Sequence, residues 1–320
     1  MKDLYNMYYI LNIIINFFKN KKNKFYDFMK WNNYAFIILF ILIIFSLITI
    51  FYNKFNWGID FTGGTVIELY FKKPITNINY VKSLIQNKYS SNINIMSFNN
   101  HNYFIKIAKK QPIIKNNVSI NYEEILDILS KQLKQRYTIK NIESIGPSID
   151  NNLILSGISA IILTLFGVGL FIGLRFGWNP ALSTILSLLH DLIITLGLIS
   201  LLNIEVDITI IASLISIISY SLNDSIVTLD RIRENSYKLK NYNINMYQII
   251  NLSINQTIKR SIITSCIILI MTLNLYFFGG ILLKNFALIM IIGVFVGTIS
   301  SIYVVSAFSL RMKTQNNSLY

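Results

Sequence analysis

Residues 181–229 read ALSTILSLLHDLIITLGLISLLNIEVDITIIASLISIISYSLNDSIVTL, two long apolar runs joined by a short acidic turn. A helix needs about 20 apolar residues to cross roughly 30 Å of hydrocarbon, and both runs are long enough. Runs of this kind occur six times, at 34–52, 153–174, 181–202, 208–229, 262–282 and 286–310. The sequence therefore predicts a polytopic α-helical membrane protein with six transmembrane helices, the last five forming a bundle over 153–310.

The composition of the 320-residue chain agrees with this, because 53% of its residues are hydrophobic and only 14% are charged. Its mean hydropathy is +0.50. Soluble domains carry about 25% charged residues, so a soluble enzyme is excluded. The single cysteine, Cys266, allows no internal disulfide.

The charges indicate how the chain crosses the membrane. Lys and Arg number 29 against 15 Asp and Glu, a net charge of +14, and the basic residues gather in segment 1–33, loop 230–261 and tail 311–320. Because cytoplasmic loops are enriched in Lys and Arg, these three segments and both termini are predicted to be cytoplasmic. Segment 53–152 then lies outside. The charge reflects topology, and no nucleic-acid partner is expected.

The external segment 53–152 is predicted to be a small α+β domain. Alternating and helical apolar patterns follow one another in the order βαββαβ, the ferredoxin-like arrangement. The predicted elements are strands at 66–71, 93–98, 103–108 and 137–145 and helices at 78–89 and 122–136.

This domain offers no catalytic set, since it has no nucleotide loop and no nucleophile beside a base. His101 lies in a turn and has no second metal ligand at useful spacing, so a solvated histidine is favoured over a metal site. The domain is expected to bind another molecule or to transmit a mechanical movement.

The stretch Gly58-Ile59-Asp60-Phe61-Thr62-Gly63-Gly64-Thr65 opens the external domain. Its glycines permit positive φ and a tight turn directly outside the first span. No Lys-Ser/Thr pair opens a helix after it, so a phosphate loop is disfavoured. We interpret Gly58, Asp60, Gly63 and Gly64 as a structural junction that aims the domain.

Two aspartates fall inside apolar spans, Asp191 beside His190 and Asp224 beside Asn223. A carboxylate within a span costs several kcal/mol unless it is paired or protonated, so each is either a structural hydrogen-bonding group or part of an ion path. Their spans are neighbours in sequence, and their polar faces are expected to meet. Movement of Arg260 towards or away from Asp224 would change that carboxyl group's affinity for a proton, although Arg260 could also be a snorkelling anchor.

Small residues recur at four-residue intervals in two spans, a pattern that allows helices to pack closely. These residues are Gly169 and Gly173 in the second span and Gly293 and Gly297 in the sixth.

Several motifs, taken in order, resemble SecF, a family of bacterial protein-export membrane proteins. The resemblance covers roughly residues 25–312. It is carried by FNWGIDFTGGT at 55–65, HD at 190–191, YSLNDS at 220–225, DRIREN at 230–235, NQTIKRSIITS at 255–265, FGG at 278–280 and GTISSIY at 297–303.

The resemblance implies a multi-pass subunit of the bacterial inner membrane, in the resistance-nodulation-division superfamily, that pairs with SecD. The implied partners are SecD, the SecYEG channel with its accessory proteins, preproteins and, indirectly, SecA. The function implied by the resemblance is to use the proton gradient in late preprotein translocation and release. No hydrolytic site, metal or cofactor is expected.

By position, Asp224 matches the family's proton-relay aspartate, Arg260 the arginine coupled to it, and Asp191 the aspartate of a His-Asp pair. Whether sodium replaces protons stays open, because oxygen ligands suit either cation.

Two other functions remain under consideration. The chain could be a half-size efflux transporter of the same superfamily, which should have a larger external domain and a substrate cavity. It could also be a non-conducting scaffold of the translocase, which should tolerate Asn in place of Asp224.

Overall fold

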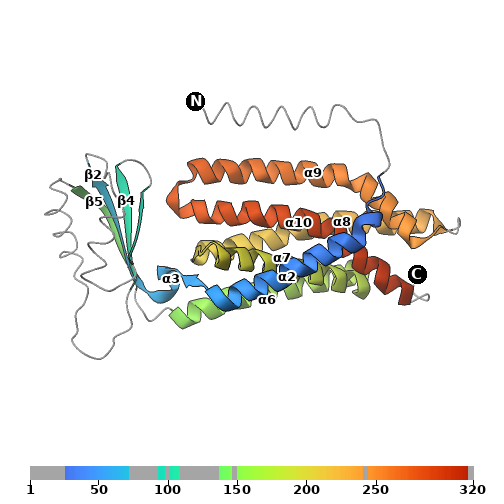
Figure 1. The fold of residues 1–320 in the computed structure, drawn as a ribbon, viewed down its shortest axis with the longest axis horizontal. Helices are drawn as coiled ribbons and strands as arrows, with labels where there is room; N and C mark the ends of the chain where they lie inside the picture. Colours follow the sequence, from blue (N-terminus) through green and yellow to red (C-terminus); the bar gives the residue numbers. More distant parts are fainter. Residues whose placement is uncertain are drawn as a thin grey trace.

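Six long helices run side by side, and a small β-sheet lies at one end of them (Figure 1). The computed structural model describes residues 26–71, 93–97, 101–108, 137–145, 150–240 and 244–315. All six helices are long and apolar enough to span a membrane, which confirms the predicted architecture. They are α2 (Asn32–Asn53), α6 (Asp150–Phe176), α7 (Trp178–Leu201), α8 (Ile208–Lys238), α9 (Met246–Phe278) and α10 (Gly280–Gln315).

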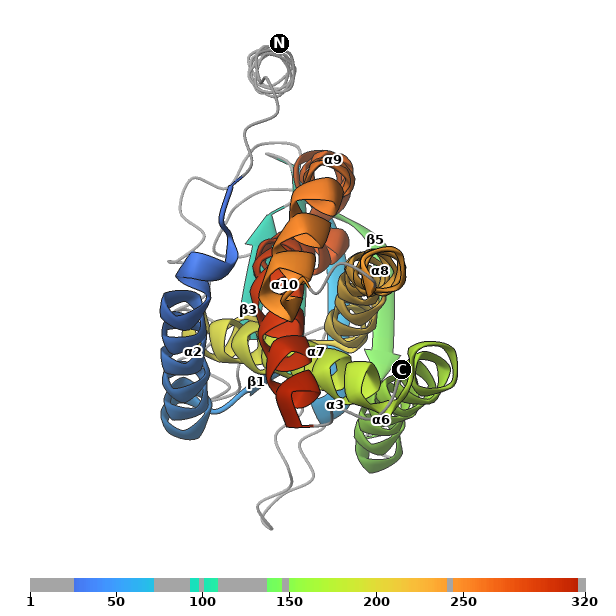
Figure 2. The same cartoon turned by 90° about the vertical axis from the view of Figure 1, so that its right-hand side faces the viewer.

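Helix α10 occupies the centre of the bundle, where it packs against α7, α8 and α9 and touches α2. Viewed along the bundle, α10 lies between α2 on one side and α8 on the other (Figure 2). The core at this centre is aliphatic, with Leu188, Leu192, Ile210 and Ile217 packed against Ile289. Helices α2, α6 and α9 carry many exposed apolar side chains, as expected where a helix meets lipid or another membrane subunit.

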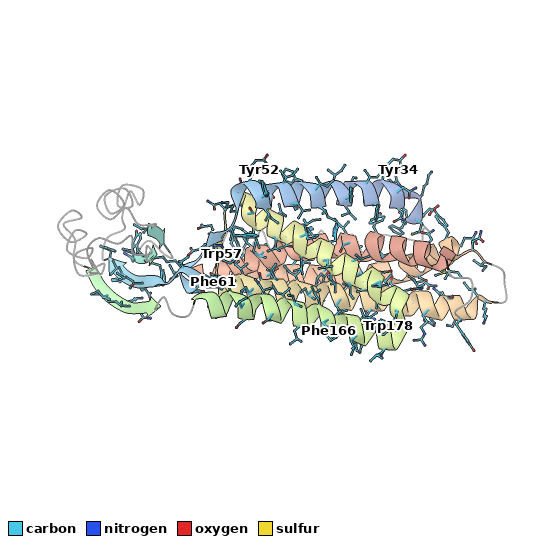
Figure 3. The ribbon with its side chains drawn as sticks, turned by 90° about the horizontal axis from the view of Figure 1, so that it is seen from below. Tyr34, Tyr52, Trp57, Phe61, Phe166 and Trp178 are labelled. Atoms are coloured by element: carbon cyan, nitrogen blue, oxygen red, sulfur yellow. The ribbon has the colours of Figure 1, made fainter. Side chains whose placement is uncertain are left out.

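Exposed aromatic side chains mark both ends of α2. Tyr34 and Tyr52 are 65% and 78% exposed and project outward at opposite ends of the helix (Figure 3). Trp178, at the start of α7, is 66% exposed. Tyrosine and tryptophan concentrate at the two membrane–water interfaces, so Tyr34 and Tyr52 agree with a membrane span along α2 and Trp178 with the start of one along α7.

The segment predicted as a cytoplasmic loop at 230–261 is mostly helical, which corrects that prediction. Helix α8 continues to Lys238 and α9 begins at Met246. The polar end of α8 is held by pairs such as Lys238 Nζ to Glu234 Oε1 at 2.6 Å, four residues apart. Ile232 and Ile250 also pack together in a small apolar cluster. The apolar run that predicted the span ends before the helix does, because a helix can continue with polar residues beyond the apolar run.

The sheet at the end of the bundle has four antiparallel strands in the order β3-β4-β2-β5. They lie where strands were predicted, and β5 has the predicted bounds. The strands are β2 (Gly64–Phe71), β3 (Ile93–Ser97), β4 (Asn102–Ala108) and β5 (Tyr137–Ile145). The helices predicted at 78–89 and 122–136 lie outside the described residues, so the full ferredoxin-like topology stays a prediction.

Candidate functional site

The junction between the first span and the sheet is bound to the connection between α7 and α8. A short strand β1 (Asn56–Trp57) pairs in parallel with β6 (Glu205–Val206). The Gly58 amide donates to the Val206 carbonyl at 2.7 Å, and the Ile208 amide donates to Asp60 Oδ2 at 3.1 Å. The junction is thus hydrogen-bonded to the residues that lead into α8.

The structure gives a reason for two of the junction glycines. A Cβ on Gly58 would lie 2.8 Å from the Val206 carbonyl oxygen, so only glycine permits this approach. Gly63 has φ 69° and ψ 154°, a conformation that favours glycine, and Gly64 begins β2. Between them, Ile59–Thr62 form a short helix, α3, rather than the tight turn that was predicted. Its Phe61 joins the core of the bundle and lies beside Trp57 (Figure 3).

Asp191 forms the first of two buried carboxylate centres. It lies on α7 and is 1% exposed. Its Oδ2 accepts from the Ser221 hydroxyl of α8 at 2.6 Å, and its Oδ1 lies 3.1 Å from His190 Nδ1. The structure therefore brings the polar faces of α7 and α8 together.

Asp224 forms the second centre, on α8, and is 4% exposed. Its Oδ2 accepts from the Ser301 hydroxyl of α10 at 3.0 Å. Ser261 of α9 lies beside the same carboxyl group, and Arg260 acts on it electrostatically. Hydroxyl groups from two other helices therefore surround a carboxylate that a span would not otherwise tolerate.

A stripe of small residues on α10 covers both centres. A Cβ added at Gly293 would overlap Ile217 of α8, so the two helices are in close contact there. One turn further, a Cβ at Gly297 would lie 3.3 Å from Ser221 Cβ and 3.6 Å from Asp191 Oδ2. Ser301, a further turn along, is the residue that donates to Asp224. Gly297 and Ser301 therefore place the Asp191 and Asp224 centres on one seam.

Three hydroxyl groups meet one turn nearer the sheet than Asp224. The Tyr220 hydroxyl contacts that of Ser265 and lies 3.0 Å from Thr298 Oγ1, while Ser265 and Thr298 are 2.9 Å apart. Ser265 and Thr298 can also donate to carbonyls of their own helices. Each hydroxyl has one hydrogen, so these contacts cannot all be hydrogen bonds at once, and the hydrogens can be redistributed.

Two of the predicted site residues lie at the edge of this arrangement. Asn223 is on the exposed side of α8, apart from the Asp224 centre, because consecutive helical residues point about 100° apart. Arg260 is exposed on α9, and no ion pair found among the described residues joins it to Asp224. Its side chain is therefore accessible at the surface of this chain, close enough to Asp224 to act on it electrostatically.

The remaining predicted residues lie away from the carboxylate centres. Gly169 and Gly173 of α6 face α7, since a Cβ on them would lie 2.6 Å from Ile185 and 3.0 Å from Trp178. His101 Nδ1 lies 2.9 Å from the Phe71 carbonyl oxygen. Within the described ranges, no three His, Cys, Asp or Glu side chains come together as metal ligands.

Sequence reasoning missed the two serines that complete the Asp224 centre. Ser261 and Ser301 carry no signal by themselves, because serines are frequent in membrane helices and only the packing of α8, α9 and α10 selects these two. Sequence reasoning also missed the ion pair between Lys106 of β4 and Glu205 of β6. The acidic turn at 203–207 was a usable signal, because an acid next to an apolar span needs a partner.

Comparison with known proteins identifies the family. The family model "Protein export membrane protein SecD/SecF, C-terminal" matches residues 125–315, and "SecD/SecF GG Motif" matches residues 49–75. The "Protein translocase subunit SecF" of Escherichia coli O157:H7 is 40% identical, covering 92% of this chain and 90% of that protein. The subunit of the same name from Vibrio alginolyticus is 34% identical and covers 93% of each.

Solved structures agree with these matches. The crystal structure of SecDF, "a translocon-associated membrane protein", from Thermus thermophilus is 32% identical with a TM-score of 0.78 and covers 91% of this chain. A SecDF structure in a "Super-membrane-facing form" has a TM-score of 0.69 at 32% identity and covers 92% of this chain. This chain spans 39% of the length of either SecDF chain.

The relatives and the six apolar helices make this a multi-pass protein of the bacterial inner membrane. The GG-motif match spans the glycine junction, and the C-terminal match spans the helices that carry both carboxylate centres. The chain therefore belongs to the SecD/SecF family of protein-export membrane proteins and, within it, to the SecF subunits of the protein translocase.

Proposed function

We propose that this subunit, paired with SecD, uses the proton gradient to assist late translocation and release of preproteins. The observation that carries the proposal is the Asp224 centre, a carboxylate 4% exposed on a candidate span and surrounded by hydroxyls of α9 and α10. Moving one charge through 100 mV releases about 2.3 kcal/mol, enough to bias a conformational equilibrium of a few kcal/mol.

The position of Asp224 along α8 suits a proton relay. It follows Ile208, the first residue of the helix, by 16 positions, or about 24 Å at 1.5 Å per residue. A hydrocarbon layer of roughly 30 Å that begins near Ile208 would therefore contain it. Arg260 acts electrostatically on Asp224 and is exposed in this chain, so its charge is available to a partner subunit.

Protonation of Asp224 changes which hydrogen bonds hold the seam. The ionised carboxylate only accepts, as it does from Ser301, whereas the protonated group also donates. Ser301 belongs to α10, the helix that packs against α7, α8 and α9, so a changed bond there acts on the whole bundle. The junction bonded to residues 205–208 would pass that movement to the sheet.

The proposed orientation puts both termini in the cytoplasm and the sheet outside. The ends of α6 and α8 that lie away from the sheet carry Arg175, Arg231, Arg233 and Lys238, the bias typical of a cytoplasmic side.

SecD is the proposed partner, because this chain corresponds to 39% of each SecDF chain and SecD-type helices would supply much of the remainder. The apolar exposed faces of α2, α6 and α9 offer surfaces for such helices. The SecYEG channel, SecA and preproteins are proposed as further partners in the complete translocase.

The test is gradient-dependent protein export into inverted membrane vesicles that carry Asp224→Asn. Asp230→Asn is the matched control, because it makes the same chemical change at an exposed position of the same helix. We expect Asp224→Asn to co-purify with SecD and to lose stimulation by the gradient, while Asp230→Asn keeps it. Unchanged stimulation with Asp224→Asn would make this subunit a scaffold instead.

A further inference from the structure

A nearly buried ion pair joins the external sheet to the membrane bundle. Lys106 Nζ lies 3.3 Å from Glu205 Oε2, and the two side chains are 10% and 9% exposed. Lys106 belongs to β4, an inner strand of the sheet, and Glu205 belongs to β6, in the connection between α7 and α8. The pair therefore links segments that are far apart in the sequence.

Other bonds converge on the same connection. The Val206 carbonyl accepts from Gly58, and the Ile208 amide donates to Asp60. Asp207 Oδ1 accepts from the Ile210 amide at 3.0 Å and caps the start of α8. Residues 205–208 thus hold the junction, the sheet and the first turn of α8 together.

These bonds have different physical properties. The junction bonds come from one short segment at the base of the sheet, which a rotation about Gly63 could leave intact while the sheet swings. Lys106 belongs to the sheet on the other side of that glycine from the bundle, so its ion pair with Glu205 opposes such a swing. Separating two poorly hydrated charges is strongly unfavourable when neither gains a new partner.

We propose that Lys106 and Glu205 are positioning residues that clamp the external sheet to the α7–α8 connection. Movement of α8, which carries Asp224, then reaches the sheet through this clamp rather than being absorbed at the glycine junction. The inference rests on the proposed proton-driven function, because it assigns the route by which that function reaches the outer domain.

The first experiment measures the clamp directly in the complex with SecD. Spin labels replace Ile139 on β5 and Leu202 at the end of α7, both exposed, in a Cys266→Ser background with a cysteine-free partner subunit. We expect one narrow distance distribution in the parent chain and a broad one in Lys106→Met. An unchanged distribution in Lys106→Met would overturn the proposal.

Two further variants separate the clamp from general damage to the sheet. Lys140→Met removes the partner of Glu68, a more exposed pair at 3.9 Å within the same sheet, and should leave the distribution narrow. The reversed pair Lys106→Glu with Glu205→Lys keeps both charges and should restore it. A Lys106→Met chain that does not fold leaves the reversed pair as the deciding variant, since its failure to restore the narrow distribution rejects a role for the ion pair.

The second experiment compares gradient-stimulated export in the same vesicles as Asp224→Asn. We expect Lys106→Met to lower the gradient-stimulated part of export at least about fivefold, which corresponds to the weaker end of the coupling found between linked sites. ATP-driven export should be retained. If Asp224→Asn loses gradient-stimulated export and Lys106→Met keeps it, the clamp is rejected and the proposed function stands. If the Asp224→Asn variant keeps gradient-stimulated export, the proposed function is rejected, whatever the distance measurement shows for the clamp.

Discussion

The two buried carboxylates differ in where their partners come from. Asp191 meets an imidazole from its own helix and a hydroxyl from α8, so this chain satisfies it from within. Asp224 meets a hydroxyl of α10, and Arg260, which acts on it electrostatically, is exposed on α9. A carboxylate whose hydrogen-bond partners all belong to its own chain is suited to a structural role. One whose charged neighbour faces outward is suited to respond to another subunit.

The largest effect is expected from a variant that disturbs both centres together. Gly297→Leu would push α10 away from Ser221 and Asp191, and overpacking of this kind costs about 1–3 kcal/mol. We expect lower thermal stability of the SecD complex and loss of gradient-stimulated export. Gly167→Leu is the control, because a Cβ there meets nothing within 4 Å. Equal behaviour of the two variants would show that α10 does not need this close approach.

Removal of the outward charge should be the next largest effect. Arg260→Gln should reduce gradient-stimulated export about five- to tenfold, within the range of coupling between linked sites. The free energy of unfolding of this chain should change by less than about 0.5 kcal/mol, since Arg260 is exposed in it. Lys259→Gln, at the neighbouring exposed position, serves as the control. If both variants export normally, Arg260 is an interfacial anchor and the contrast between the carboxylates loses its functional meaning.

Asp191→Asn should affect stability more than export. The two contacts use different carboxylate oxygens, and in the amide one of these positions becomes an NH2 group that faces either His190 Nδ1 or the Ser221 hydroxyl, so a buried hydrogen bond is weakened or lost at a cost of about 1–3 kcal/mol. We expect a lower unfolding temperature of the SecD complex but normal gradient-stimulated export per folded complex. Loss of export at normal stability would place Asp191 in the ion path beside Asp224.

The smallest effect is expected at the Tyr220 hydroxyl group, one turn nearer the sheet than Asp224. Tyr220→Phe keeps the ring and removes one hydroxyl, while Ser265 and Thr298 remain 2.9 Å apart. The expected loss is about 0.5–1.5 kcal/mol of stability, as for a single hydrogen bond, with export per complex unchanged. Thermal unfolding and vesicle export measure the two quantities. A large export defect would instead extend the proton path from Asp224 to Tyr220.

Local patterns were sufficient to predict the helices and strands. An apolar run of about 20 residues must form a helix in lipid, because its backbone groups have no other hydrogen-bond partners there. Alternation likewise located Tyr137–Ile145, whose bounds match those of β5. The same reasoning did not give the helical ends within 230–261, because hydropathy indicates where an apolar run ends and does not indicate where a helix ends.

The candidate site was only partly accessible from sequence. Asp191 and Asp224 stand out because carboxylates are rare within apolar spans. Asn223 was grouped with them by adjacency, yet it lies on the exposed side of α8. The pairing of Asp224 with Ser301 needed knowledge of which face of α10 meets α8, and no local pattern contains that information.

The sequence by itself determined that this chain has six helices able to span a membrane, carries a small sheet and places two carboxylates inside those helices. These properties follow from the free energy of transferring each residue between water and lipid, which depends on the residue and its near neighbours. Only the tertiary structure decided that α10 joins both carboxylates along one seam and that Lys106 pairs with Glu205. Such contacts link distant segments, and they depend on how whole helices and strands pack against one another.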